Sequence, residues 1–367
     1  MRLTCSNVDL LNGVNIVSKA VSNRTTLPIL ECILLEAEGN YLKLTGNDLE
    51  IGIESKVIAN VEKTGSIALE AKIFSEIVRK LPDGEVLISV DSNNMTTIKC
   101  ENSEFKISGQ NGDNFPELPK VEKDKHFVLK QAVLKDMIRQ TIFSIATEET
   151  RPVLTGELFQ IRDNHLRLVS VDGYRVSYRQ APLSVEREEQ EVIVPGKTLG
   201  EINKILSSDE EDVYIYFTNK HILFDLGDSM VVSRLLEGEF LKYENSFFED
   251  CETMIQVNRR ELLMSIERAA LITREGRKNP IKIDITGDKM IITSNTELGT
   301  AKEELPVDTE GKDLTIAFNP KYLIDALRVI DDEEIKIQFI SSLNPCIIKP
   351  VDNEDYKYLI LPIRLNG

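Results

Sequence analysis

Apolar and polar residues follow the same order at three places along the chain. A short alternating stretch predicts a strand, a polar break follows, and apolar residues at three- and four-residue spacing then predict an amphipathic helix. The three segments are residues 1–23, 125–147 and 252–273. A proline follows each helix, at Pro28, Pro152 or Pro280, and alternating hydrophobic residues then predict a β-hairpin. Gly, Asn or Asp, which tolerate positive φ, occupy the expected turns.

A second half-repeat follows in each third of the chain and reads as strand, helix, acidic turn and strand. Its three copies are residues 66–90, 191–217 and 314–339. Lys72, Lys197 and Lys321 open the three helices at intervals of 125 and 124 residues. Solenoid repeats have periods of roughly 20 to 50 residues, so a period of about 120 favours triplication of a whole domain over a solenoid.

The length of 367 residues agrees with triplication, because one domain usually takes about 150 residues or fewer. We predict an α+β fold of three similar domains, each made of two strand-helix-strand units. The domains are expected at residues 1–125, 126–250 and 251–367. No apolar stretch approaches the roughly 18 residues that span a bilayer, which favours a cytoplasmic location. The five cysteines are far apart, so neither a disulfide framework nor a zinc site is expected.

Positive charge is concentrated in the predicted helices of an acidic chain. The formal net charge of −17 would by itself argue against nucleic acid as a partner. The six predicted helical stretches nevertheless carry +9, and the remainder of the chain carries −26. This segregation is expected if all six helices face one polyanion. The alternative is that Lys and Arg favour helices, while Asp and Glu collect in turns, in any α+β protein.

The sequence shows no catalytic constellation. Its three histidines, His126, His165 and His221, are isolated on strand-like segments, and no phosphate-loop, nucleophile-elbow or zinc-protease motif occurs. The acidic run 331–334 could bind Mg²⁺, but solvated acidic residues are common at such helix-to-strand turns. The absence of Trp disfavours stacking on single-stranded nucleic acid. No catalytic residue, metal or cofactor is therefore expected.

Four motifs in register with the repeat resemble bacterial sliding clamps. They are RTTLPIL at residues 24–30, LTGNDLE at 44–50, VDGYR at 171–175 and LPIRL at 361–365. The resemblance implies a ring-shaped processivity factor that encircles duplex DNA. This factor would tether the replicative polymerase and other clamp-binding proteins during DNA replication and repair. It also implies a head-to-tail homodimer whose helices line the hole and whose strands face outward.

The resemblance assigns two sets of contact residues. Sequence-independent contacts with DNA phosphates would come from Arg24, Lys72, Arg79 and Lys197. For each of these, ordinary solvated charge at a helix end is the alternative. The dimer interface would join Phe105 and Ile107, on an edge strand of the first domain, to Leu271 and Ile272 of the third. The alternative is that Phe105 and Ile107 face the core of their own domain.

A third site implied by the resemblance is an apolar pocket between the second and third domains, which would receive short linear peptides from polymerases, the clamp loader and repair proteins. The matched positions are Leu154, Val171, Gly173, Tyr174, Arg175, Val176, Leu241, Asn319, Tyr322, Leu343, Leu359, Ile360, Pro362, Ile363, Arg364 and Leu365. The chain departs from the usual residues of the family at Tyr174, Leu241, Asn245 and Lys278, and it runs two residues past Leu365. These departures are expected to alter peptide preference more than the existence of the pocket. Residues 359–365 are expected to form both a final strand and one wall of this pocket.

A clamp without chemistry is therefore the leading hypothesis, with duplex DNA, a second copy of the chain and partner peptides as its partners and no membrane. Two other classes of function stay open at this point. One is a nucleic-acid-processing enzyme with a cryptic carboxylate metal site, which a metal-dependent activity would reveal. The other is a protein-binding scaffold that never meets DNA, which equal retention on circular and linear duplex DNA would favour.

Overall fold

The computed structural model describes residues 1–22, 25–123, 126–147, 150–184, 188–248, 250–273 and 280–364. The chain divides into two compact units. Unit 1 comprises Met1–Ala132 and Glu201–Leu235, and unit 2 comprises Val133–Gly200 and Leu236–Gly367. The division passes through the central repeat, so each unit holds one complete repeat and part of the central one.

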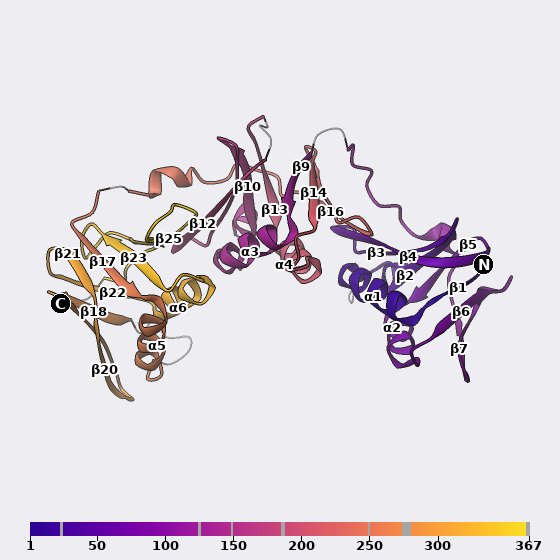
Figure 1. Ribbon diagram of the computed structural model, residues 1–367, viewed down its shortest axis with the longest axis horizontal. Coiled ribbons are helices and arrows are strands. Elements are labelled where there is room, and N and C mark those ends of the chain that lie inside the picture. Colours follow the sequence, from indigo (N-terminus) through magenta and orange to yellow (C-terminus); the bar gives the residue numbers. More distant parts are fainter. Residues whose placement is uncertain are drawn as a thin grey trace. The chain divides into compact units, whose positions relative to one another are not determined.

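Each repeat contributes two α-helices and antiparallel strands (Figure 1). The first repeat contains β1 (Arg2–Ser6), α1 (Asn7–Val17), β2 (Cys32–Glu38), β3 (Tyr41–Asn47), β4 (Ile51–Lys63), β5 (Gly65–Glu70), α2 (Ala71–Lys80), β6 (Glu85–Val90), β7 (Met95–Cys100) and β8 (Ser103–Ser108). The second contains β9 (His126–Lys130), α3 (Gln131–Thr141), β10 (Gly156–Arg162), β11 (His165–Val171), β12 (Arg175–Pro182), β13 (Gln190–Pro195), α4 (Gly196–Ile205), β14 (Asp212–Phe217), β15 (His221–Asp225) and β16 (Ser229–Arg234). The third contains β17 (Thr253–Asn258), α5 (Arg259–Ala270), β18 (Ile281–Thr286), β19 (Lys289–Thr296), β20 (Gly299–Pro306), β21 (Asp308–Gly311), β22 (Leu314–Phe318), α6 (Pro320–Val329), β23 (Glu334–Phe339), β24 (Cys346–Pro350) and β25 (Tyr356–Ile360).

Short 3-10 helices lie between these elements. They are η1 (Ser18–Ala20), η2 (Pro28–Glu31), η3 (Gly112–Asn114), η4 (Ile142–Ser144), η5 (Pro152–Thr155) and η6 (Tyr243–Ser246). Two of them begin at prolines that the sequence marks as breaks, because proline suits the first position of a helix and cannot continue a preceding one.

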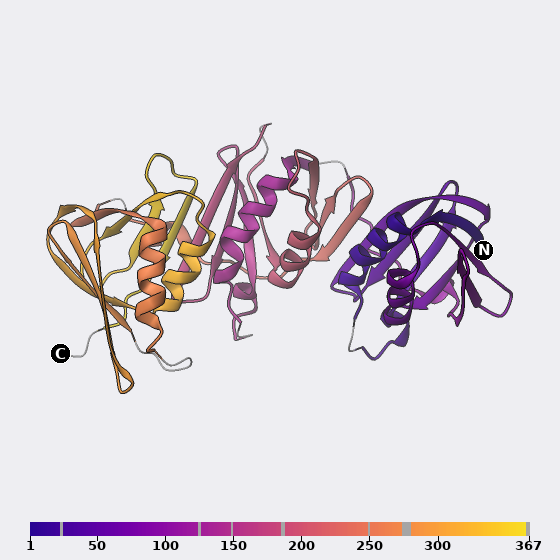
Figure 2. The ribbon, with the colours of Figure 1, turned by 60° about the horizontal axis from the view of Figure 1, so that its bottom comes forward.

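The pattern of α2 shows why the amphipathic segments form helices. Ala71, Phe74, Ile77 and Val78 recur at three- and four-residue spacing, and all four are buried. Their polar neighbours stay exposed on the other face. The helices pack in pairs within a unit: α1 lies beside α2, and α5 lies beside α6 (Figures 1 and 2).

The sheets continue from one repeat into the next. In unit 1 the main strand order is β8-β7-β6-β1-β4-β16-β15-β14-β9, with β2, β3 and β5 attached beside this path. In unit 2 one sheet has the order β13-β10-β11-β12-β25-β24-β23-β17-β21, and a second has β20-β19-β18-β22. The pairs β4·β16 and β12·β25 therefore join consecutive repeats. The strands β8 and β20 each end a sheet.

The structure confirms the predicted α+β triplication and its hairpin turns. Asp163 and Asn164 have φ values of 51° and 58°, and Gly39 and Gly287 are also at positive φ. One expectation is wrong. The final strand was expected to run from Leu359 to residue 365, but β25 ends at Ile360. Proline at 362 has no N–H to donate to a ladder, which fits the end of the strand just before it.

A carboxyl group lies in the interior of unit 2. Glu157 on β10 has no exposed surface, and its Oε2 atom accepts a hydrogen bond of 3.1 Å from the Thr141 hydroxyl. Its Oε1 atom has no hydrogen-bond partner among the described residues. Burial raises the pKa of Glu157 to about 8, against the opposing effect of the Thr141 hydrogen bond. This carboxyl is therefore mostly protonated at neutral pH.

Candidate functional site

A cavity of about 440 Å³ lies in unit 2, which is within the roughly 300 to 1,000 Å³ typical of ligand pockets. It is lined by Arg151, Val171, Gly173, Tyr174, Arg175, Val176, Leu241, Tyr243, Ser246, Pro345, Leu359 and Leu361. These residues come from the facing ends of β11 and β12 and the turn between them, from residue 151 just before η5, from the segment before β17, from residue 345 just before β24, and from the end of β25 with the residue after it. The mixture of branched apolar walls and a few polar groups suits the side chains of an extended peptide.

The β11–β12 turn sets one wall of the cavity. Gly173 has a φ of 90°, a conformation that favours glycine. The Asp172 Oδ1 atom accepts hydrogen bonds from the backbone N–H groups of Tyr174 at 2.9 Å and Arg175 at 3.1 Å. This turn leaves Tyr174 about half exposed, with its ring stacked on Tyr322 of α6 at 5.9 Å between centroids.

Arg175 fastens this wall to two other elements. Its guanidinium donates to Asp172 Oδ2 at 2.9 Å, to Asp325 Oδ2 on α6 at 2.8 Å and to the Phe143 carbonyl at 2.7 Å. It also lies 4.7 Å from the centre of the Tyr322 ring. Only 6% of Arg175 is exposed. The residue therefore lines the cavity mainly as a structural support, with its donors already committed.

The structure brings together part of the predicted pocket. Seven predicted positions line the cavity: Val171, Gly173, Tyr174, Arg175, Val176, Leu241 and Leu359. Five others surround it or lie away from it: Leu154 and Ile360 are buried in hydrophobic clusters, Asn319 caps α6, Tyr322 stacks on Tyr174, and Leu343 is 67% exposed. Pro362, Ile363 and Arg364 follow β25 outside the lining, and the Ile363 N–H donates to the Ala317 carbonyl at 2.8 Å. Leu365 and Lys278 lie outside the described residues.

Sequence reasoning missed five lining residues: Arg151, Tyr243, Ser246, Pro345 and Leu361. Leu361 belongs to the LPIRL motif, so position in that motif could have identified it. Arg151 is exposed at the cavity and adds a cation that could pair with an acidic peptide residue. The other three lie in connecting segments, where periodicity carries no information.

The predicted interface residues lie near the two sheet edges. Phe105 on β8 is 38% exposed and Ile107 is half-buried, so Phe105 does not face a core within the described chain. Leu271, directly after α5, is 81% exposed. The carbonyl of Ile272 accepts a hydrogen bond of 3.0 Å from Thr296, at the end of β19. A large apolar side chain left this exposed suggests a missing partner.

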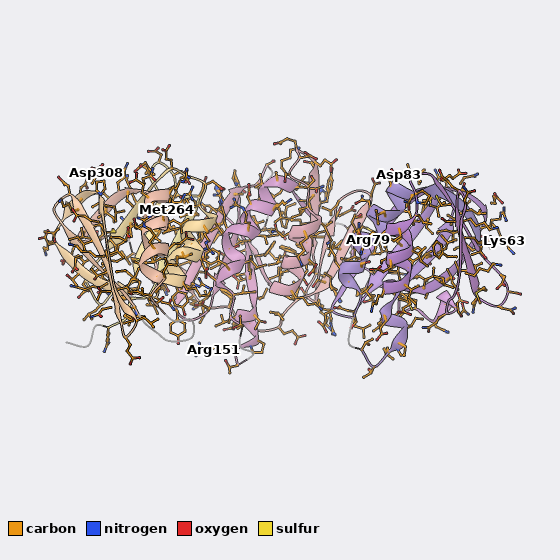
Figure 3. All side chains as sticks on the ribbon, turned by 90° about the horizontal axis from the view of Figure 1, so that it is seen from below. Lys63, Arg79, Asp83, Arg151, Met264 and Asp308 are labelled. Atoms are coloured by element: carbon orange, nitrogen blue, oxygen red, sulfur yellow. The ribbon has the colours of Figure 1, made fainter. Side chains whose placement is uncertain are left out.

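The predicted DNA contacts lie partly on the exposed faces of the helices. Lys72 and Arg79 are exposed on α2, and Lys197 is exposed on α4 (Arg79 in Figure 3). Arg79 lies 3.4 Å from Glu76, so its charge toward a polyanion is partly compensated within the chain. Arg24 lies outside the described residues.

Several other helix cations are paired within the chain. Arg139 binds Asp331 at 2.5 Å, Lys204 binds Glu201 at 2.8 Å, and Arg328 binds Glu267 at 2.7 Å. The positive excess read from the sequence therefore overstates the charge available to a polyanion.

Within the described ranges, no three His, Cys, Asp or Glu side chains are grouped so as to hold a metal ion. In the acidic run after α6, Asp331 pairs with Arg139, and Asp332 accepts a hydrogen bond of 2.8 Å from the Tyr356 hydroxyl. Of the helices that the structure describes, none is long and apolar enough to cross a membrane.

These features define a class of protein: a three-domain DNA clamp fold, with six α-helices in the part of the chain that the structure describes and antiparallel sheets that run across the repeats. Family models of the DNA polymerase III beta subunit match the chain in three parts. The N-terminal domain model matches residues 1–119, the central domain model 128–242 and the C-terminal domain model 246–364.

The chain belongs to this family, the bacterial beta sliding clamps, and is a non-catalytic processivity factor of DNA polymerase III. It is 41% identical to a beta sliding clamp of Staphylococcus epidermidis, over 99% of both chains. Among solved structures, it resembles a putative DNA polymerase III beta subunit of Eubacterium rectale at 49% identity and a TM-score of 0.96. It resembles the sliding clamp of Bacillus subtilis at 37% identity and a TM-score of 0.97. Both comparisons cover 100% of each chain.

Proposed function

We propose that two copies of this chain assemble head to tail into a closed ring of six domains that encircles duplex DNA. The observation that carries the proposal is the repeated pattern of sheet junctions. At each internal junction, the third hairpin strand of one repeat pairs with the last strand of the next repeat: β4 pairs with β16, and β12 pairs with β25. In the third repeat the corresponding strand is β20, and no further repeat follows to pair with it. The last strand of the first repeat, β8, is likewise unpaired on one side among the described residues, so both strands end their sheets. A second copy supplies each missing partner, and two such contacts close a ring.

The internal junctions also predict the register of the contact between copies. When the repeats are aligned through their strand pairs, Phe105 of β8 is equivalent to Val231 of β16 and Tyr358 of β25. Val231 is paired with Ile53, and Tyr358 is paired with Ser177. The position of Ile53 and Ser177 in the third repeat is Ala301. Phe105 of one copy is therefore expected opposite Ala301 of the other.

Side chains along the two edges suit this register. It places Glu104 opposite Lys302 and Lys106 opposite Thr300, so an acidic residue faces a basic one across the strands. On the same face of β20 as Ala301, Glu303 forms an ion pair with Arg268 of α5. That face therefore points toward α5, whose end carries Leu271 and Ile272. Phe105 would lie beside these two residues and cover their exposed apolar surface.

The cations on the helices would face the DNA and bind it only weakly. Sequence-independent attraction to phosphates, which weakens with salt, would come from four cations: Lys72 and Arg79 on α2, Lys197 on α4, and Arg24. Retention then depends on topology, because a closed ring cannot leave a circle. We place the domain boundaries at residues 125/126 and 250/251.

The test of encirclement is retention on DNA of two topologies. Protein loaded onto a nicked circular duplex should stay bound at high salt and should be lost once the same DNA is linearised. Equal loss from both forms would contradict encirclement. Tight and salt-insensitive binding to a linear duplex would contradict it as well.

The cavity in unit 2 is proposed to receive short linear peptides of the replicative polymerase, the clamp loader and repair proteins. Its apolar walls and Arg151 support this role. Deleting residues 361–367, which removes the lining residue Leu361, should abolish binding of such peptides while far-UV circular dichroism and native mass stay unchanged. Undiminished peptide affinity would place the site elsewhere.

A further inference from the structure

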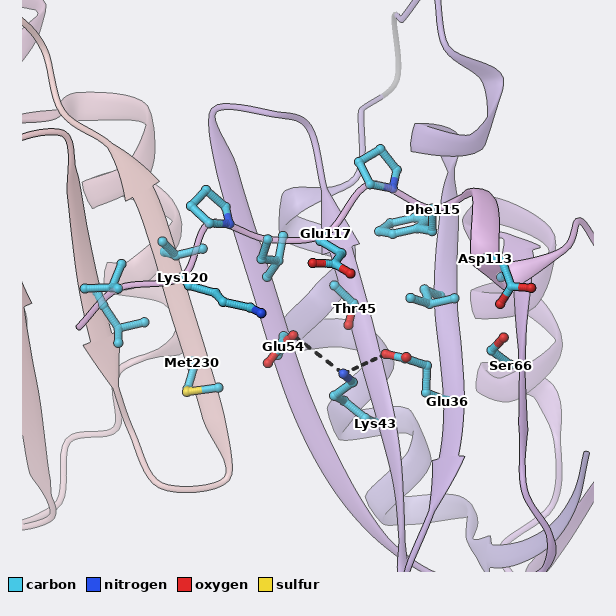
Figure 4. A pocket seen from close by; sticks show the side chains of 18 of the residues that line it. Glu36, Lys43, Thr45, Glu54, Ser66, Asp113, Phe115, Glu117, Lys120 and Met230 are labelled. Atoms are coloured by element: carbon cyan, nitrogen blue, oxygen red, sulfur yellow. Dashed lines mark ion pairs between the residues drawn. The ribbon is translucent and has the colours of Figure 1, made fainter. Parts of the chain in front are cut away.

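A larger hollow of about 810 Å³ lies in unit 1, between strands β2, β3 and β4 and the first linker, defined as residues 109–123 (Figure 4). Its floor carries an ion-paired group in which the Lys43 ammonium lies 2.7 Å from Glu36 and 3.9 Å from Glu54. Apolar side chains flank this group, with Phe115 on one side and Met230 on the other. The hollow therefore combines polar recognition groups with apolar walls.

Thr45 gives an independent sign that the hollow is incomplete. It is only 3% exposed and lines the hollow, beside the ion-paired group (Figure 4). Its hydroxyl has no hydrogen-bond partner among the described residues. A buried hydroxyl without a partner is costly, so native structures usually supply one from the protein, from water or from a ligand.

The corresponding place in the second repeat is filled. The strand registers pair Glu36 with Lys43 and Thr45 with Glu54. The same registers in the second repeat pair Gln160 with Arg167 and Val169 with Tyr178. Glu54 thus stands where the second repeat has Tyr178, and Thr45 stands where it has the fully buried Val169.

The second linker, defined as residues 235–248, covers that place with aromatic rings. It starts at an equivalent point, because Leu236 bridges to Ile193 as Gln110 of the first linker bridges to Ala68. Tyr243 and Phe247 lie 5.9 Å and 6.0 Å from the ring of Tyr178. The Tyr243 hydroxyl donates to Gln160 at 2.8 Å. Two linker rings and a phenolic donor therefore complete the second copy, and the first linker supplies no such pair.

We propose that the hollow in unit 1 is a second peptide site, which takes an extended segment of a partner protein carrying a tyrosine and a second aromatic residue. The tyrosine ring would occupy the space that Tyr178 and Tyr243 fill in the second repeat. The hydroxyl of this tyrosine would donate a hydrogen bond to Glu36 or Glu54. It would also give the Thr45 hydroxyl a hydrogen-bond partner. The second ring would pack on Met230. The proposal does not depend on the function of the cavity in unit 2.

The probe is a synthetic peptide, FLKYENSFF, with the sequence of residues 240–248 of this chain, titrated into the intact protein with labelled methyl groups. Methyl resonances of Thr45 and Met230 should shift with saturation below about 1 mM. Val176 and Leu359, which line the cavity in unit 2, report binding there separately. Absence of shifts at Thr45 and Met230 would overturn the proposal.

Variants distinguish a built site from surface adhesion. Met230→Ala removes the apolar surface on which the second ring would pack and should weaken the peptide at least tenfold, about the effect of one lost anchor. Ile58→Ala, at a residue that is 80% exposed, should leave binding unchanged. Thr45→Val keeps the shape and should weaken the peptide roughly fivefold, the effect of one hydrogen bond. Binding that survives both Met230→Ala and Thr45→Val overturns the site, and binding of tyramine without the peptide overturns its assignment to a protein segment.

Discussion

The internal junction β12·β25 and the proposed junction between copies differ at the position that Arg175 holds in β12. Arg175 stands opposite Ile360 on β25, whereas Gly299 holds the same position on β20 and would face Ile107. Arg175 ties its junction to α6 and η4 through two donated hydrogen bonds. Gly299 has no side chain with which to do this. The junction between copies would therefore lack the side-chain hydrogen bonds that tie β12·β25 to α6 and η4.

The largest expected effect comes from the junction between copies. Replacing Leu271 and Ile272 together with Ala should weaken the dimer, because large-to-small changes at buried contacts cost about 2 to 5 kcal/mol each. Thermal unfolding of the chain should change little, since Leu271 is 81% exposed within it. Sedimentation at several concentrations measures the shift toward monomer. Leu343→Ala, at another exposed leucine, is the control, and an unchanged dimer in the double variant would place the interface elsewhere.

Breaking the internal junction should cost stability instead of assembly. Arg175→Ala leaves Asp172 and Asp325 without their buried partner, which typically costs about 3 to 5 kcal/mol. Urea unfolding measures the loss. Lys357→Ala on the adjacent strand removes only a partly exposed pair with Glu354 and should cost below about 1 kcal/mol. A similar loss in the free energy of unfolding for the two variants would mean that Arg175 does not stabilise this junction.

A pH series separates the stability of unit 2 from assembly. Because the folded pKa of Glu157, about 8, exceeds the ordinary value of 4.5, its folded state keeps a proton that the unfolded state loses. Its stabilising contribution is therefore full below pH 4.5 and is lost as pH rises toward 8, by about 1.4 kcal/mol per unit at most. Glu157→Gln should abolish this slope in unfolding experiments. The exposed Glu310→Gln should retain it, and parallel slopes in all three proteins would show that Glu157 ionises normally.

The smallest effect concerns DNA. Lys72→Ala should reduce the slope of log affinity against log salt by about 0.9, the contribution of one phosphate contact. Lys63→Ala, on β4 (Figure 3), should leave the slope unchanged. If both variants or neither reduced the slope, the assignment of Lys72 to the DNA face would fail.

Sequence periodicity captured the repeated architecture, because each amphipathic segment buries the face that its spacing defines, as in α2. It could not show where long-range pairing stops. The strand predicted over residues 359–365 ends at Ile360, because Pro362 has no N–H to donate to the ladder. Periodicity also could not distinguish a residue that holds the pocket wall in place from one that would contact a bound peptide. Arg175 was expected as a pocket residue, yet its donors are committed to Asp172, Asp325 and Phe143.

Residues in connecting segments were the least accessible to sequence reasoning. Tyr243 lines one cavity, and the first linker borders the other, but neither segment has a periodic pattern that predicts its place on a sheet. Charge was also misleading in part. The helix excess of the sequence includes Arg139 and Arg328, whose charges are compensated within the fold.

The most direct test of head-to-tail closure is a cross-link between the two edges. Lys106→Cys with Thr300→Cys places two thiols opposite each other in the expected register, and Cys251→Ser removes the native cysteine that is not fully buried. Oxidation should give one covalent species of about 83 kDa, twice 41.5 kDa, which stays on nicked circular DNA in denaturant. Monomers without cross-links, or a ladder of open-ended oligomers, would contradict the closed two-copy ring.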